Sequence, residues 1–547
     1  MLAINVFELK QHCLVWKKKM TVYDDERYIR LVEIVNEATV VDAHTHIQDD
    51  LPDFSEKSIS QKLAGTQASY NQPSEDVIQR AIASGCFVRR TMMDPTHALF
   101  YSWFAEIVEG ASGRLDECIS LLGRNSKRDR IRAGRFILQQ LRESRHSEYA
   151  EWLRIMFRLY DGVLPDKDPL DPTSFDELWE AVEAQRHNPD FARDILKKHK
   201  VLAYVTSIEN RANIPLGTPV HPGDVDLSDY IHPEAWLMFD FNGLLWPERA
   251  TDFGLFTQGH KFQAERYIFH LEEYFENEIG SAKKLQDEVY SFIRRIIRSP
   301  KYNPNSRVLY VDGFQSETWR FSTPYSRATV DYAIRHYKEQ LEGNYRLQTI
   351  SCVAEAMLQA LNDIGLEYKD SGERFGCCLQ LAGGARHFMD WAREVQSIPV
   401  NIPNLAQDEY PVWTRYPHIH FEYICAHESL YCDLASAAKQ VGNVSVGPWW
   451  HFFRRHKIAQ MIQDQISMGP VSSIACGFTD ARYVEMMVAK QRSLRIAVAD
   501  ALYNFVINPH SSLYNSFDGA AEMVQDLLLV NPISVHHIPT TSFYAYD

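Results

Sequence analysis

Short runs of apolar residues alternate along the chain with longer stretches in which apolar residues recur at helical spacing. Strands that alternate with helices in this way predict parallel β-α-β units. The chain has eight such runs, at residues 38–47, 200–207, 236–241, 307–312, 376–381, 421–427, 443–446 and 473–478. Residues 98–107 are an alternative position for one strand. The pattern predicts an α/β fold, and eight strands is the number in a TIM (β/α)8 barrel.

The length of the chain exceeds what one barrel needs. A (β/α)8 barrel takes about 250 residues, whereas this chain has 547. Residues 110–195 have helical periodicity and are rich in Arg, Glu and Leu, so we expect a helical insertion there. The predicted organisation is an N-terminal helical segment at 1–37, followed by a barrel at 38–547 that contains this insertion.

Charge and composition argue against several classes of partner. The formal net charge of −15 disfavours a nucleic-acid partner, because phosphate binding requires clustered Lys and Arg. No apolar run is long enough to span a bilayer, so we expect no membrane association. The nine Cys are scattered without a CxxC pair, which indicates reduced thiols in a cytoplasmic protein. The oligomeric state is left open, a homo-oligomer included.

The sharpest chemical signal is His44-Thr45-His46, at the end of the first run. Residues two apart in a strand point to the same side, so both imidazoles can reach one metal ion. Neutral imidazole suits zinc and other divalent ions of the first transition row. Asp42 precedes them on the same face and can support a ligand from behind. The alternative is a pair of polar histidines at a loop entry, but the D-x-H-x-H arrangement after a β-rich run favours metal binding.

Thr479-Asp480-Ala481-Arg482 follows the last run. In a closed barrel the last strand lies beside the first, so Asp480 can complete the metal site or move a proton. Arg482 can bind a substrate carboxylate. The alternative for Asp480 is an N-cap of the following helix, which fits the sequence equally well.

Further candidates follow other runs. Asp312 and His427 each end a run, where they can transfer protons or contact substrate, or simply be caps or buried polar residues. Trp449 and Trp450 can form a pocket wall or pack in the core. Arg386 follows two glycines that permit close approach of a ligand, and can bind an anion or lie on the surface.

In this order, the segments resemble the uronate isomerase (glucuronate isomerase) family of the amidohydrolase superfamily. Residues 443–450, Asn-Val-Ser-Val-Gly-Pro-Trp-Trp, are similar to a family strand ending in Gly-x-Trp-Trp. Residues 477–482, Gly-Phe-Thr-Asp-Ala-Arg, are similar to its Thr-Asp-Ser-Arg segment. Residues 312–321 resemble its Ser-Asp-His segment, and residues 378–381 resemble a segment that continues with His. Gly313 and Ala382 stand where the family has His, a difference that a relative with another substrate would show.

The resemblance implies a distorted TIM barrel with one divalent metal ion, zinc being the first candidate, held by His44, His46 and Asp480. It implies interconversion of the aldose and ketose forms of a hexuronate such as glucuronate or galacturonate. Asp480 or Asp312 would then move a proton between C2 and C1. The substrate would be bound by Arg482, Arg386, Trp449, Trp450 and His427. The alternatives are a metal-dependent hydrolase of the same superfamily with a different carboxylated substrate, and a non-catalytic sugar-binding relative.

Overall fold

The computed structural model describes most of the predicted strands and helices. The described residues are 25–45, 47, 91–92, 94–99, 126–140, 147–160, 168–185, 188, 190–208, 235–240, 267–298, 308–313, 325–371, 377–383, 412–425, 431–447, 455–481 and 483–538.

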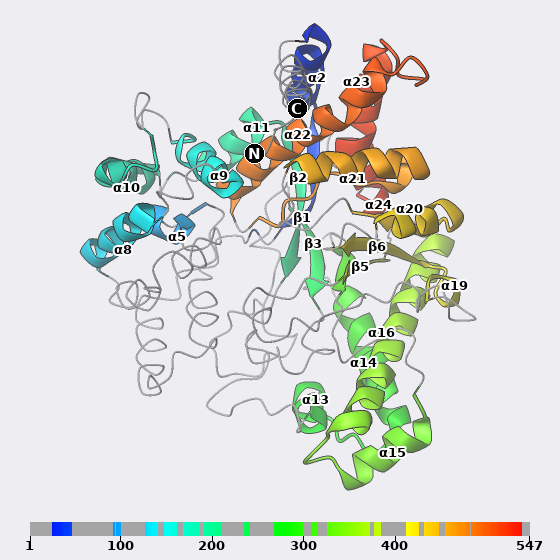
Figure 1. Ribbon diagram of the computed structural model, residues 1–547. Coiled ribbons are helices and arrows are strands. Elements are labelled where there is room, and N and C mark those ends of the chain that lie inside the picture. The colour runs from blue at the N-terminus through cyan, green and yellow to red at the C-terminus, as the bar shows by residue number, and fades with distance from the viewer. Residues whose placement is uncertain are drawn as a thin grey trace, which may run out of the picture.

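In the described part of the chain, seven parallel strands form one sheet, in which each strand pairs with the next one along the chain. The strands are β1 (Val40–Thr45), β2 (Val201–Ile208), β3 (Ala235–Asp240), β4 (Val308–Gly313), β5 (Cys377–Gly383), β6 (Ile419–Cys425) and β7 (Val444–Val446). They coincide with the first seven predicted runs, and the helices lie around them (Figure 1). The sequential parallel order is the one that β-α-β units produce.

The eighth predicted run is not a regular strand, but it contacts both edges of the sheet. Its second residue, Ile474, bridges Val446 of β7, and Ala481, three residues beyond its end, bridges Thr45 of β1. Between these points, the Cys476 amide donates to the Leu527 carbonyl at 3.0 Å, so it is not available to a neighbouring strand. Residues 474–481 therefore connect the first and last strands of the sheet without continuing the ladder.

Helices cover the sheet and extend beyond it. Before β2 they are α2 (Glu26–Glu37), α5 (Pro95–Leu99), α8 (Lys127–Gln140), α9 (Glu148–Phe157), η3 (Pro172–Ser174), α10 (Phe175–Gln185) and α11 (Phe191–Lys198). Between β3 and β6 they are α13 (Tyr267–Phe275), α14 (Ala282–Arg298), α15 (Arg327–His336), α16 (Gly343–Ser371) and α19 (Val412–Arg415). After β6 they are α20 (Tyr431–Gln440), α21 (Arg455–Met468), η9 (Val471–Ser473), α22 (Val484–Ile507), α23 (Phe517–Gln525), η10 (Asp526–Val530) and α24 (Asn531–Val535).

The helices α8 to α11 fall in the region predicted as an insertion. Their apolar side chains share one hydrophobic cluster with β2 residues such as Tyr204 and with the start of α22, including Tyr483 and Val484. This helical region therefore packs directly on the sheet and on α22. Its status as an insertion into a barrel, like the separate N-terminal segment at 1–37, stays a prediction.

The two faces of the strands pack in different clusters. Val40 belongs to the largest cluster, which includes α14 and α16, whereas its neighbour Val41 packs with Ala203 and Trp236 in a smaller one. Val535 at the end of α24 joins this smaller cluster. Because side chains alternate along a strand, one face of the sheet is covered by helices such as α14 and α16. The other face is covered in part by the C-terminal region.

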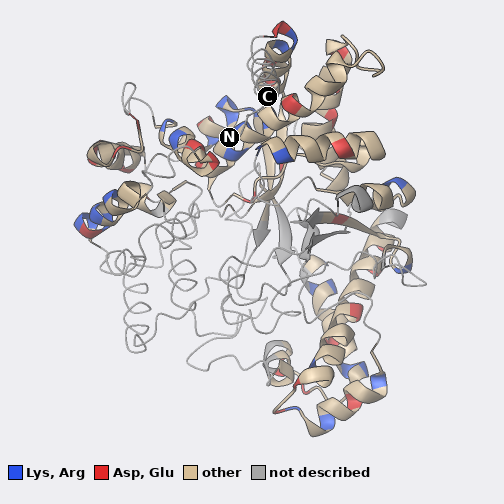
Figure 2. Cartoon of the chain, in the orientation of Figure 1, with Lys and Arg blue, Asp and Glu red and all other residues tan. Residues whose placement is uncertain are grey.

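Helix α22 is the most enclosed helix of the described chain. Apolar residues lie on every side of it, and Glu485, Lys490, Gln491 and Arg495 are buried as well. By contrast, Figure 2 shows Lys and Arg beside Asp and Glu along peripheral helices such as α8 and α15. Among the described residues, no helix is long and apolar enough to cross a membrane.

Candidate functional site

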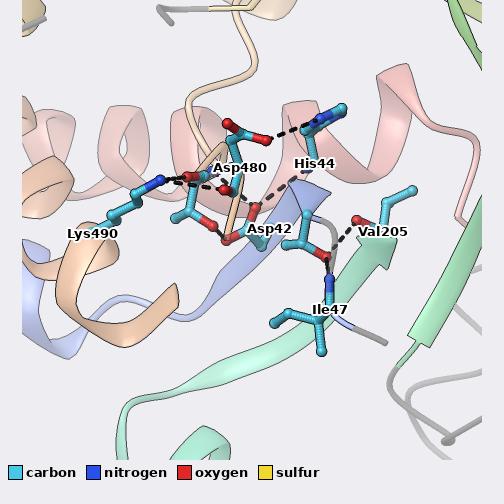
Figure 3. A network of polar contacts seen from close by, with 8 residues as sticks. Asp42, His44, Ile47, Val205, Asp480 and Lys490 are labelled. Carbon is cyan, nitrogen blue, oxygen red and sulfur yellow. Dashed lines mark hydrogen bonds and ion pairs between the residues drawn. The ribbon is translucent and has the colours of Figure 1, made fainter. Parts of the chain in front are cut away.

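The end of β1 and the residues before α22 meet at His44 and Asp480. The Nε2 atom of His44 lies 3.7 Å from Oδ1 of Asp480, and the two side chains are only 7% and 13% exposed. The Asp480 amide also donates to the His44 carbonyl at 2.9 Å. Figure 3 shows the two side chains directed toward one another. The His44 ring is stacked on Phe478, with centroids 4.9 Å apart, which fixes the plane of the imidazole.

The alternation of side chains along β1 is irregular, although the sequence predicts that Asp42 and His44 point to the same face of the strand. Asp42 pairs with Tyr204 and Thr45 pairs with Thr206, so three steps on β1 match two on β2 and the register shifts between them. A bulge of this kind changes the direction in which the following side chains point. The Thr45 hydroxyl then donates to the Val205 carbonyl at 3.0 Å, which ties the end of β1 to β2.

Asp42 faces α22 rather than the His44 ring. Its carboxylate accepts hydrogen bonds from the Thr479 hydroxyl at 2.6 Å, the Thr479 amide at 3.2 Å and Gln491 Nε2 at 2.9 Å. The backbone amide of His44 also donates to it, at 3.3 Å. Complete burial outweighs these hydrogen bonds and raises the Asp42 pKa to about 7. Asp42 thus joins β1, Thr479 and α22, and it supports the backbone of His44 instead of its imidazole.

Asp480 has a left-handed backbone with φ of 51°. Helix α22 begins at Val484 with Tyr483 as its N-cap, so the alternative in which Asp480 caps this helix is wrong. The Lys490 ammonium donates to the carbonyls of Thr479 at 2.8 Å and of Asp480 at 3.3 Å (Figure 3). The carboxylate of Asp480 therefore does not cap α22, and it is directed to His44.

Several predicted site residues cannot be compared with this geometry. His46, Arg386, His427, Trp449, Trp450 and Arg482 lie outside the described residues. Asp312 lies in β4, where the backbone register places it beside Asp240 of β3 and Gln380 of β5. His44 and Asp480 are thus the predicted ligands that the described chain brings together, and the roles of all these residues stay predictions.

The His44–Asp480 pair fits a divalent cation in both chemistry and spacing. An imidazole nitrogen and a carboxylate oxygen are ordinary zinc ligands, and ligand atoms on one tetrahedral zinc ion lie about 3.4 Å apart. The observed separation of 3.7 Å is close to this value. Within the described ranges, His, Cys, Asp and Glu form no group of three or more that could hold a metal ion. A third ligand would have to come from the undescribed part of the chain, where His46 is the predicted one.

Sequence reasoning missed the contributions of Lys490 and Gln491. Both lie in α22, and both reach residues beside the His44–Asp480 pair. The available signal was their position in a helix that carries apolar residues on every side, where a charged or amide side chain needs buried partners.

The parallel sheet and its helices define an α/β fold, and comparison with solved structures finds similar folds. The uronate isomerase from Thermotoga maritima aligns with a TM-score of 0.60 at 14% identity, over 93% of this chain and 97% of that one. The glucuronate isomerase from Caulobacter crescentus aligns with a TM-score of 0.59 at 13% identity, over 93% of each chain. The uronate isomerase from Bacillus halodurans C-125 gives 0.56 at 14% identity, over 93% of this chain and 96% of that one.

No family model matches the sequence, and no curated protein matches it either. The structural alignments confirm the predicted resemblance to uronate isomerases at the level of the fold, and they extend over nearly the whole chain.

Proposed function

We propose that this protein is a metal-dependent aldose–ketose isomerase that acts on a hexuronate or a related sugar acid. The observation that carries the proposal is the His44–Asp480 pair, 3.7 Å apart at the end of the first strand. The fold supports it, since three solved uronate or glucuronate isomerases align over 93% of the chain.

The proposed architecture is a distorted (β/α)8 barrel in which residues 474–481 take the place of the eighth strand. The bridges to Val446 and Thr45 support this closure. Active sites of such barrels lie at the carboxyl ends of the strands, and His44 is near the carboxyl end of β1. The helices at 110–195 are then an insertion between the first and second strands.

In the proposed site, His44 and Asp480 hold one divalent cation together with His46, with zinc as the first candidate. Such an ion, when bound, polarises the carbonyl oxygen of the substrate. The reaction requires a carboxylate to take the proton from C2 as the C2–H bond breaks, and to return it to C1 as the C1–H bond forms. Asp480 and Asp312 are the candidates for this proton transfer.

The remaining predicted residues would bind the sugar acid. Arg482 and Arg386 would pair with its carboxylate, because a guanidinium can donate two parallel hydrogen bonds to it. Trp449, Trp450 and His427 would line the pocket and contact the sugar hydroxyls.

Metal analysis and proton exchange test the proposal. The purified protein should contain about one divalent ion per chain, and with glucuronate or galacturonate in heavy water it should yield ketose product and deuterium at C2 of recovered aldose. His44→Ala should lose the metal and the exchange. His510→Ala is the matched control, since His510 lies in an exposed turn.

Two results would count against the isomerase. Full metal content and full activity in the His44→Ala protein would exclude the site. A metal-loaded protein that exchanges deuterium with neither uronate would exclude the reaction, and would favour hydrolysis of another carboxylated substrate.

A further inference from the structure

We propose that Lys490 is a positioning residue that fixes the backbone of Asp480 and so sets the direction of its carboxylate. The consequence for catalysis rests on the proposed function, whereas the positioning itself does not. Lys490 belongs to α22 and is only 6% exposed.

The geometry of the contact is specific to the conformation of Asp480. Lys490 Nζ lies 2.8 Å from the carbonyl oxygen of Thr479 and 3.3 Å from that of Asp480. These two carbonyls belong to the peptide groups on either side of the Asp480 Cα atom. Holding both groups therefore restricts φ and ψ of Asp480 together.

Asp480 needs such a restraint. Its φ of 51° is in the left-handed region, which is unfavourable for residues with a Cβ atom, although Asp and Asn enter it more readily than most others. One restraint comes from β1, because the Asp480 amide donates to the His44 carbonyl at 2.9 Å. Lys490 supplies the other restraint from the opposite element, α22.

The burial of a charged amine at this position has a physical reason. An enclosed ammonium group is costly unless its donors are satisfied, and here two carbonyl oxygens accept from it. The Trp152 ring lies 5.5 Å from Nζ, and the indole N–H of Trp152 donates to Ser493 Oγ at 2.8 Å, which keeps the ring in place. An apolar residue could fill this volume, but it could not hold the two carbonyls.

The neighbouring residue of α22 reinforces the same assembly. Gln491 donates to Asp42 at 2.9 Å, and Asp42 in turn accepts from the Thr479 hydroxyl at 2.6 Å. Two consecutive residues of α22 thus hold residues 479 and 480 in place. Lys490 donates directly to their carbonyls, and Gln491 acts through Asp42, which accepts from Thr479. Gln491 acts only indirectly, through Asp42, so substitution of Lys490 is the more direct test.

Amide hydrogen exchange on the metal-free protein tests the positioning. In Lys490→Met, which keeps the length and apolar stem, we expect the Asp480 amide to exchange at least about 10-fold faster while core strands keep their protection. Lys490→Arg should retain protection, because a guanidinium can also donate to both carbonyls. Lys283→Met, which removes an exposed amine on α14, should leave the Asp480 amide unchanged.

Zinc titration tests the consequence for the site. We expect the dissociation constant for zinc to rise about 10- to 100-fold in Lys490→Met, with recovery in Lys490→Arg. With a hexuronate substrate, kcat should fall more than KM rises, since the carboxylate is displaced and the sugar contacts are kept. If Lys490→Met does not fold, Lys490→Leu, which also has no donor, carries the same tests.

The outcomes separate this proposal from the proposed function. Unchanged exchange at Asp480 would overturn the positioning. A uniform rise at all amides would also overturn it, because it would show that Lys490 has a general structural role. A wild-type protein that binds neither zinc nor any other divalent metal ion would refute the metal-dependent function, and the exchange experiment would still decide the role of Lys490.

Discussion

The Asp480 amide donates a 2.9 Å hydrogen bond to the carbonyl oxygen of His44, and their side chains approach to 3.7 Å. One residue is the next to last of the first strand, and the other precedes the long helix α22. Backbone and side-chain contacts therefore coincide at a single point where distant parts of the chain join. Disturbing either the backbone or the side chains there has separate, measurable effects.

The carboxylate of Asp480 should matter to the reaction more than to the fold. Asp480→Asn keeps the size of the side chain, and Asn also tolerates a left-handed backbone, so the melting temperature should change little. We expect kcat for a hexuronate to fall about 10²- to 10⁴-fold, the usual contribution of a proton-transfer group. Asp518→Asn, at an exposed position in α23, is the control. Activity within a factor of two of wild type would remove Asp480 from the mechanism.

Gly477 should be essential for the contact between β1 and residues 474–481. A Cβ atom at this position would lie 1.9 Å from the carbonyl oxygen of Val41, which belongs to the backbone and cannot rotate away. We expect Gly477→Ala to lower the free energy of unfolding by about 3 kcal/mol, measured by urea denaturation. At Gly280 nothing lies within 4 Å of a Cβ atom, so Gly280→Ala is the matched control. Equal stabilities of the two variants would contradict the close approach.

Glu485 should make stability fall as the pH rises through the weakly acidic range. Its carboxylate is completely buried and accepts from the Tyr160 hydroxyl and the Met92 amide, and burial raises its pKa from 4.5 to about 7. Between these values the folded state keeps a proton that the unfolded state has released, so each pH unit favours unfolding. Below pH 4.5 both states are protonated and above about pH 7 both are ionised, so the effect is confined to this window.

Comparison with Glu485→Gln isolates this contribution from that of Asp42, which titrates in the same range. From pH 4.5 to about 7, the wild-type free energy of unfolding should fall by about 3 kcal/mol relative to that of the variant. Urea midpoints across this range provide the measurement. Parallel curves for the two proteins would mean that the pKa of Glu485 is the same in the folded and unfolded states.

Arg495 should be a structural anchor with no part in the chemistry. Its guanidinium donates to the carbonyls of Ala38 at 2.7 Å and of His199 at 3.1 Å, and to that of Val35, at the ends of α2 and α11. Arg495→Met would leave these enclosed carbonyls without their donor, so we expect a loss of about 3–5 kcal/mol in the free energy of unfolding. Arg492→Met removes an exposed Arg of the same helix and should cost little. A similar, small loss in both variants would show that water replaces the guanidinium.

Much of the fold could be predicted from the chain alone. The runs at 200–207 and 307–312 match β2 and β4 within a residue or two, because buried parallel strands are continuous apolar segments bounded by polar ones. The prediction that residues 473–478 form a regular strand was wrong. The apolar residues of this segment do lie in the core, but the amide of Cys476 bonds to Leu527, a choice that no local pattern records.

The candidate site could be predicted only in part. The residue types of His44 and Asp480, and their positions after the first and last predicted strands, were enough to predict that they meet. Closure of a barrel brings its first and last strands together. The turning of Asp42 toward α22 could not be foreseen, because it depends on a register shift against β2. Lys490 was missed because a charged residue in a helix usually indicates a solvent-exposed face, whereas here it meets two carbonyls of a preceding loop.

The joining of β1 to residues before α22 has a consequence for biosynthesis. During translation, the ribosome produces His44 early and must add more than four hundred further residues before Asp480, Lys490 and Gln491 leave the exit tunnel. Throughout that time, the buried carboxyl of Asp42 lacks the partners that shield it in the finished molecule. The first strand of the nascent chain thus lacks the residues that later cover its polar end, and the candidate site is among the last features of the protein to form.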